Sequence, residues 1–231
     1  MHAVEINNWK ESRLPDDFPD FVRQAREVQL HHCDFSDREL RQWFSANTES
    51  LEIVPASGFL STQGLTCLAA APNLKRLRLE AYYFGRGYGA HCLQAILSHP
   101  ALEEIEFWPD LADLAEVPAT GQPHSLKVLK LRLYRTDRQP QVEQEFAWLK
   151  DCCELRRIEY RATEPSSFLL KTSELCPTVT ELAIENLSAA EVDVLVNWRG
   201  LKLVELRGKA DEKLLARLAA TDLNIMRVRS K

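Results

Sequence analysis

The chain has 231 residues, of which 45% are hydrophobic and 27% charged, and its formal net charge at pH 7 is −5. This composition is typical of a globular domain and excludes a disordered chain. The acidic balance disfavours nucleic acid as a partner. No apolar run approaches the roughly 18 residues of a membrane span, so no membrane partner is expected. The first residues contain no secretory signal, so we expect a cytoplasmic location with reduced cysteines.

One motif recurs along the chain: an apolar residue, two variable residues, a second apolar residue, one variable residue and a third apolar residue. The intervals between copies run from 22 residues (Val179 to Leu201) to 29 (Leu126 to Leu155). Each copy predicts one short strand. In chain order the ten copies are Met1–Ile6, Ala25–Leu30, Thr48–Ile53, Leu74–Leu79, Leu102–Phe107, Leu126–Leu131, Leu155–Tyr160, Val179–Ile184, Leu201–Leu206 and Leu223–Val228.

This pattern resembles the leucine-rich-repeat (LRR) family, whose units are about 20–29 residues long. The repeats resemble bacterial or ribonuclease-inhibitor-like ones. They are expected to be irregular, because the Asn or Cys that usually closes the turn after the strand occurs only at Cys33. The resemblance covers nearly all of residues 1–231 and implies a single domain. The implied fold is an α/β horseshoe-shaped solenoid of about ten irregular repeats, with a parallel sheet on the concave face and helices or turns on the convex face.

The segments between the strands contain several helix signals. Ser36–Glu39 and Ser188–Glu191 both match a capping box, in which the first and last side chains bond each other's backbone amide. Leu14–Phe18 resembles the Leu-Pro-x-x-Phe turn that follows the strand in some bacterial and plant repeats. Asp110–Pro123, with two prolines and a glycine, predicts an irregular segment. Further helices are expected at Ala90–Ser98, Val142–Cys152 and Asp211–Ala220.

The variable position between the second and third apolar residues carries charges whose sign alternates from strand to strand: Glu52, Arg78, Glu106, Lys130 and Glu159. Adjacent strands lie about 4.8 Å apart, so opposite charges can pair laterally, each pair contributing about 0.2–1 kcal/mol. Two compatible interpretations follow. The charges satisfy one another and keep the sheet soluble, or they form a specificity code for a protein partner.

Two surfaces are candidate partner sites. The first consists of three residues that each follow the third apolar residue of their copy of the motif: Trp108, Arg132 and Arg161. Trp and Arg are enriched in binding hot spots. We expect Trp108 to be exposed on the concave rim; the alternative is that it packs under the irregular segment. The second surface is an aromatic, glycine-rich loop whose candidate residues are Tyr82, Tyr83 and Tyr88. The alternative there is packing onto the neighbouring repeat.

No catalytic motif occurs, so no enzyme activity and no cofactor are expected. His31, His32, Cys33 and Asp34 are a candidate metal cluster by composition. Adjacent side chains on a strand point to opposite faces, so at most two of them can converge and no metal site is expected.

The sequence therefore predicts a non-catalytic protein–protein interaction module with an unidentified protein partner. The alternatives are an inhibitor or immunity protein that blocks a toxin or enzyme, and a recognition fragment of a larger multidomain protein. Both ends lie on strands without polar caps, which also allows end-to-end self-association.

Overall fold

A computed structural model describes residues 3–7, 18–33, 40, 44–55, 68, 71–79, 89–109, 111–133, 146–162, 167–208 and 210–228. Ten strands form one parallel sheet in the order β1 to β10, each paired with its neighbours in sequence. The strands are β1 (Ala3–Asn7), β2 (Glu27–Cys33), β3 (Ser50–Pro55), β4 (Arg76–Leu79), β5 (Glu104–Phe107), β6 (Val128–Leu133), β7 (Arg157–Ala162), β8 (Glu181–Ile184), β9 (Leu203–Leu206) and β10 (Asn224–Arg227). The predicted α/β fold with a parallel sheet is confirmed.

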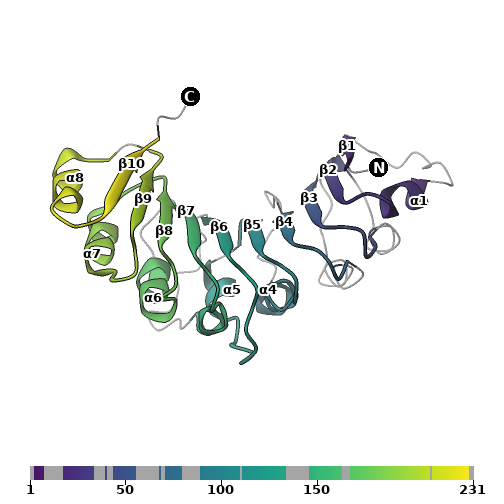
Figure 1. The fold of residues 1–231 in the computed structure, drawn as a ribbon, viewed down its shortest axis with the longest axis horizontal. Helices are drawn as coiled ribbons and strands as arrows, with labels where there is room; N and C mark the ends of the chain where they lie inside the picture. The colour runs from purple at the N-terminus through teal and green to yellow at the C-terminus, as the bar shows by residue number, and fades with distance from the viewer. Residues whose placement is uncertain are drawn as a thin grey trace.

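The sheet is curved, and the helices lie on its outer side (Figure 1). We call the opposite side of the sheet the inner face. It carries Glu52, Arg78, Glu106, Lys130 and Glu159.

None of the described helices is long and apolar enough to cross a membrane. The helices are α1 (Phe18–Arg23), α4 (Gly89–Leu97), α5 (Leu111–Ala115), α6 (Ser167–Leu175), α7 (Ala189–Asn197) and α8 (Glu212–Ala219), with a 3-10 helix, η2 (Ala147–Asp151).

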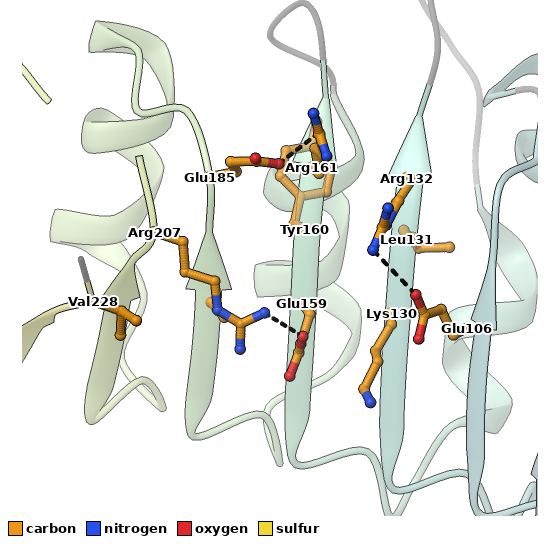
Figure 2. A pocket seen from close by; sticks show the side chains of 11 residues that line it. Glu106, Lys130, Leu131, Arg132, Glu159, Tyr160, Arg161, Glu185, Arg207 and Val228 are labelled. Atoms are coloured by element: carbon orange, nitrogen blue, oxygen red, sulfur yellow. Dashed lines mark hydrogen bonds and ion pairs between the residues drawn. The ribbon is translucent and has the colours of Figure 1, made fainter. Parts of the chain in front are cut away.

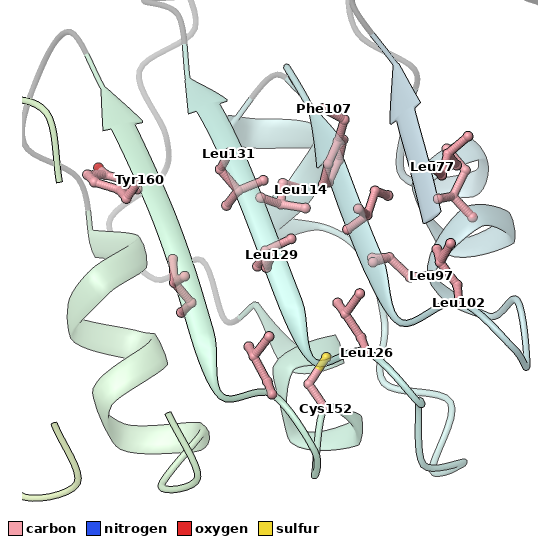
Figure 3. Packing of buried hydrophobic residues seen from close by; sticks show 14 of the residues in the cluster. Leu77, Leu97, Leu102, Phe107, Leu114, Leu126, Leu129, Leu131, Cys152 and Tyr160 are labelled. Atoms are coloured by element: carbon pink, nitrogen blue, oxygen red, sulfur yellow. The ribbon is translucent and has the colours of Figure 1, made fainter. Parts of the chain in front are cut away.

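The second apolar residue of each motif stacks in register on its equivalents, as the pairings of Leu77 with Ile105 and of Ile105 with Leu129 illustrate. These side chains point between the sheet and the helices, where Leu97 and Leu114 meet them (Figure 3). From β1 to β9 the second apolar residues all lie in the core, at 6% exposure or less. They are Val4, Val28, Leu51, Leu77, Ile105, Leu129, Ile158, Leu182 and Val204.

A polar ladder that the motif did not reveal joins the turns that lead into the strands. Lys75 O accepts hydrogen bonds from two amides of the next repeat, those of Glu103 and Glu104, at 2.8 and 2.9 Å. The same two-amide pattern recurs at the carbonyls of Arg26, Glu49, Glu103, Lys127, Arg156 and Thr180. Side chains reinforce the ladder. Asn73 Nδ2 donates to Ala46 O at 2.7 Å. Backbone groups at the turns are thereby satisfied by the preceding repeat.

The predicted helices around residues 90–98, 188–197 and 211–220 are confirmed as α4, α7 and α8. Ser188 and Glu191 form the predicted capping box, with Ser188 N donating to Glu191 Oε2 at 2.7 Å. Two expectations need correction. The segment expected to be irregular contains the short helix α5, and within Val142–Cys152 the residues Ala147–Asp151 form a 3-10 helix, η2. Helix α6 was not anticipated. The Ser36–Glu39 box and all but the last residue of Leu14–Phe18 lie outside the described residues.

The tenth repeat is shifted by one residue from the predicted motif. Ile225, not Met226, pairs with Val204, and Met226 stands opposite Glu205 on the inner face. Met226 is accordingly 43% exposed, whereas Ile225 is partly buried against the core. Ile225 thus takes the place in the stack that the sequence pattern had given to Met226.

Candidate functional site

The inner face carries charged side chains that pair across neighbouring strands. Arg78 lies between two carboxylates, with its Nη1 2.8 Å from Glu52 Oε1 and its Nε 3.6 Å from Glu106 Oε1. Arg132 Nη2 lies 3.4 Å from the same oxygen of Glu106. The predicted lateral pairing is therefore confirmed. Further ion pairs join Lys130 to Glu104 on the neighbouring strand and Arg161 to Glu185, the residue after β8. His31 Nε2 lies 3.1 Å from Glu52 Oε1.

Arg157 on β7 reaches across β8 to β9, a span that pairing between adjacent strands does not predict. Its Nη1 and Nη2 donate to Glu205 Oε1 and Oε2 at 3.0 and 2.9 Å, and Nη1 also bonds Glu181 at 2.9 Å. Arg207 crosses in the opposite direction, and its Nη1 donates to Glu159 Oε2 at 2.5 Å. We call five residues the three-strand network. Four lie on β7, β8 and β9 and the fifth directly follows β9: Arg157, Glu159, Glu181, Glu205 and Arg207.

Ala183 makes this crossing possible. It occupies the inner-face position of β8, in register between Glu159 and Glu205. A methyl side chain leaves room for the two arginines to pass over β8. The alanine that interrupts the run of charged residues from Glu52 to Glu205 in this column is the sequence signal that could have revealed the network.

The network changes the protonation equilibria of its members. The hydrogen bond from Arg157 holds the pKa of Glu205 below its usual value, against the opposing effect of burial. Burial alone would raise the pKa of Glu159, but the hydrogen bond and charge of Arg207 outweigh it and lower that pKa. Both carboxylates are therefore ionised at neutral pH and act as fixed acceptors for the arginines.

The expectation that Trp108 is exposed is wrong. Its side chain is only 5% exposed, directly after β5. Arg132 stacks on it instead, with its guanidinium carbon 5.1 Å from the ring centroid. Such a cation–π contact restrains the arginine. Trp108 therefore supports Arg132, and Arg132 is the group that reaches the surface.

A hollow of about 280 Å³ opens on the inner face between β5 and β10 (Figure 2). Five of the predicted site residues line it: Glu106, Lys130, Arg132, Glu159 and Arg161. Arg78 lies one strand away, on β4. Tyr82, Tyr83 and Tyr88 lie outside the described residues. The sequence interpretation missed the remaining lining residues, which are Leu131, Tyr160, Ala183, Glu185, Arg207 and Val228.

Comparison of the chain with protein-family models gives no match, and comparison with curated proteins gives none either. Function must therefore be argued from the chemistry of the inner face.

Cys33 and His31, which belong to the candidate metal cluster, are held in structural contacts. Cys33 is buried and its Sγ lies 3.3 Å from Ile6 O, while His31 faces Glu52. Within the part of the chain that the structure describes, no three His, Cys, Asp or Glu side chains gather as metal ligands. Burial raises the pKa of Cys176 to about 12, so it stays a thiol at neutral pH. Burial also lowers the pKa of His124.

Proposed function

We propose that the chain is a leucine-rich-repeat solenoid that binds a protein partner on its inner face and catalyses no reaction. The single-strand repeats stacked in sequence order support the family assignment, because such a solenoid requires one strand per unit. The hydrogen bond from Cys33 to Ile6 O supports it further. It joins the last residue of β2 to β1, at the motif position where the family usually has Asn or Cys.

The observation that carries the proposed binding function is the hollow and the charged side chains around it. Lateral ion pairs and the stacking of Arg132 on Trp108 hold these side chains in defined positions. A surface whose charged groups are already positioned loses less conformational entropy when a partner binds. The signs of those groups then select partners with complementary charge.

A pull-down from a lysate of the native host tests this proposal. The double variant Arg132→Ala/Arg161→Ala removes two cations from the hollow. The matched control Lys213→Ala/Arg217→Ala removes two cations from α8, on the outer side, where both side chains are exposed. Washes are made at low salt, because screening weakens contacts between exposed charges.

We expect mass spectrometry to find proteins that the wild-type chain and the α8 control retain and the inner-face variant loses. The identity of those proteins also distinguishes an adaptor from an inhibitor. If all three baits retain the same proteins, the inner face is not the binding surface and the proposal is wrong.

A further inference from the structure

The register of the sheet contains one like-charged pair. Six of the described pairings join two charged residues of opposite sign on adjacent strands. The exception among the described strands is Arg132 of β6, which is in register with Arg161 of β7. Like charges directly opposite each other destabilise a sheet. The register of Arg132 and Arg161 therefore opposes stability at this point of the inner face, unlike the six opposite-charge pairings. The six opposite pairs are Glu52–Arg78, Arg76–Glu104, Arg78–Glu106, Glu106–Lys130, Lys130–Glu159 and Arg157–Glu181.

The carboxylates beside the two arginines neutralise them only in part. Glu106 is shared, because its Oε1 lies 3.4 Å from Arg132 and 3.6 Å from Arg78. Arg161 contacts Glu185 through its Nε, at 2.5 Å, and its side chain is 53% exposed. The planar fork of a guanidinium carries five N–H donors. Both arginines therefore retain donors that can bind an incoming acceptor.

The two arginines lie on the wall of the hollow, at the carboxyl ends of β6 and β7 (Figure 2). Four of the lining side chains are basic and three are acidic, so the lining carries one excess positive charge. The basic residues are Lys130, Arg132, Arg161 and Arg207, and the acidic ones are Glu106, Glu159 and Glu185. The volume of the hollow, about 280 Å³, lies close to the lower limit of the roughly 300–1,000 Å³ that is typical of small-molecule sites. A hollow of this size accommodates a side chain of a protein partner.

We infer that Arg132 and Arg161 together bind a carboxylate of the protein partner, so that the partner's contact segment is acidic. This inference rests on the proposed function and specifies the chemistry of that partner. A carboxylate placed between two guanidiniums forms charge-assisted hydrogen bonds to both and removes their mutual repulsion. The whole chain carries a net charge of −5 and repels acidic peptides at long range. Binding of such a peptide therefore requires a local cationic site.

The test measures fluorescence anisotropy of a fluorescein-labelled hexa-glutamate peptide, with a hexa-lysine peptide and free succinate as comparison ligands. We expect wild type to bind hexa-glutamate in preference to both. Arg132→Ala/Arg161→Ala is expected to weaken this binding about tenfold or more, since a hydrogen bond to a charged group contributes about 1.5–3 kcal/mol. Lys213→Ala/Arg217→Ala, which removes the same charge from α8, is expected to leave it unchanged. Arg161→Gln, at the more exposed of the two arginines, gives a second variant with little risk to folding.

Three results would overturn the inference: equal hexa-glutamate affinity for wild type and the inner-face variant, tighter binding of hexa-lysine, or succinate binding as tightly as the peptide. These outcomes are distinguishable from failure of the proposed function. If hexa-glutamate does not bind but the inner-face variant still loses its partner in the pull-down, only the acidic character of the partner is wrong.

Discussion

Replacing Arg157 with Met is expected to lower the free energy of unfolding by about 2–3 kcal/mol. The change removes the cation that contacts the carboxylates of Glu159, Glu181 and Glu205 together, and leaves Arg207 as the remaining cation beside Glu159 and Glu205. Removing one partner of a buried ion pair costs about 3–5 kcal/mol. The expected loss is smaller, because the Arg157 side chain is still 22% exposed and water can solvate part of the freed charge. Denaturant unfolding, followed by circular dichroism, measures this change.

Two further variants distinguish the network from ordinary surface charge. Arg217→Met removes an exposed ion pair with Asp193 on the outer side, and exposed pairs contribute only about 0.2–1 kcal/mol. Arg157→Met/Glu205→Met removes both ends of the crossing pair and is expected to be less destabilising than the sum of its single substitutions. Equal losses for Arg157→Met and Arg217→Met would show that the network contributes no more than a surface pair.

The stability difference between wild type and Arg157→Met should shrink as the pH falls. The folded-state pKa values of Glu159 and Glu205 are lowered, so the stability that these carboxylates contribute is fully present above their unfolded pKa of about 4.3. It is lost as the pH falls from about 5 through the lowered folded-state values. A difference that stays constant from pH 7 to pH 3 would contradict this assignment.

Replacing Gly208 with Ala is expected to destabilise the last repeats by about 3 kcal/mol, the upper part of the usual range for overpacking. A Cβ at this position would lie 1.8 Å from Glu185 O, a backbone atom that cannot move without its strand. Hydrogen exchange reports the damage locally, because the amides of Arg207 and Val228 donate to Ile184 O and Leu206 O. Both amides are expected to exchange faster in the variant.

Gly121→Ala is the matched control for this substitution. Gly121 has a φ of +70°, but a Cβ added there would meet no atom within 4 Å, so only backbone strain of about 1–2 kcal/mol opposes an alanine. Its effect is expected to stay near the 111–127 segment and to leave the amides of β9 and β10 unchanged. If Gly208→Ala destabilises the protein no more than Gly121→Ala, the close approach to Glu185 O is not a real constraint.

The sheet was predictable because the apolar motif reports burial directly. Leu77, Ile105 and Leu129 recur at one motif position and stack in one column of the core. The motif failed at β10. Ile225 and Met226 are both apolar there, and the pattern allows either of them to point into the core between the sheet and the helices. Stacking on Val204 decides between them. That information belongs to the neighbouring strand and not to the local sequence.

The candidate site was only partly predictable. Charge alternation identified neighbours such as Glu52 and Arg78, because adjacent strands have a fixed spacing. The bond from Arg157 to Glu205 spans two repeats and depends on the small side chain of Ala183 between them. Trp108 lies just beyond the end of β5, where strand alternation no longer sets side-chain direction, and burial of its large apolar surface decides its position.

Site-specific photocrosslinking tests most directly whether the partner binds on the inner face. Val228 and Val196 are similarly exposed, at 41% and 42%. Val228 lines the hollow, whereas Val196 lies on α7, on the outer side of the sheet. With p-benzoylphenylalanine in place of one or the other, we expect a crosslinked partner from position 228 and none from position 196. The same partner crosslinked equally from both positions, or from position 196 alone, would contradict the proposed binding surface.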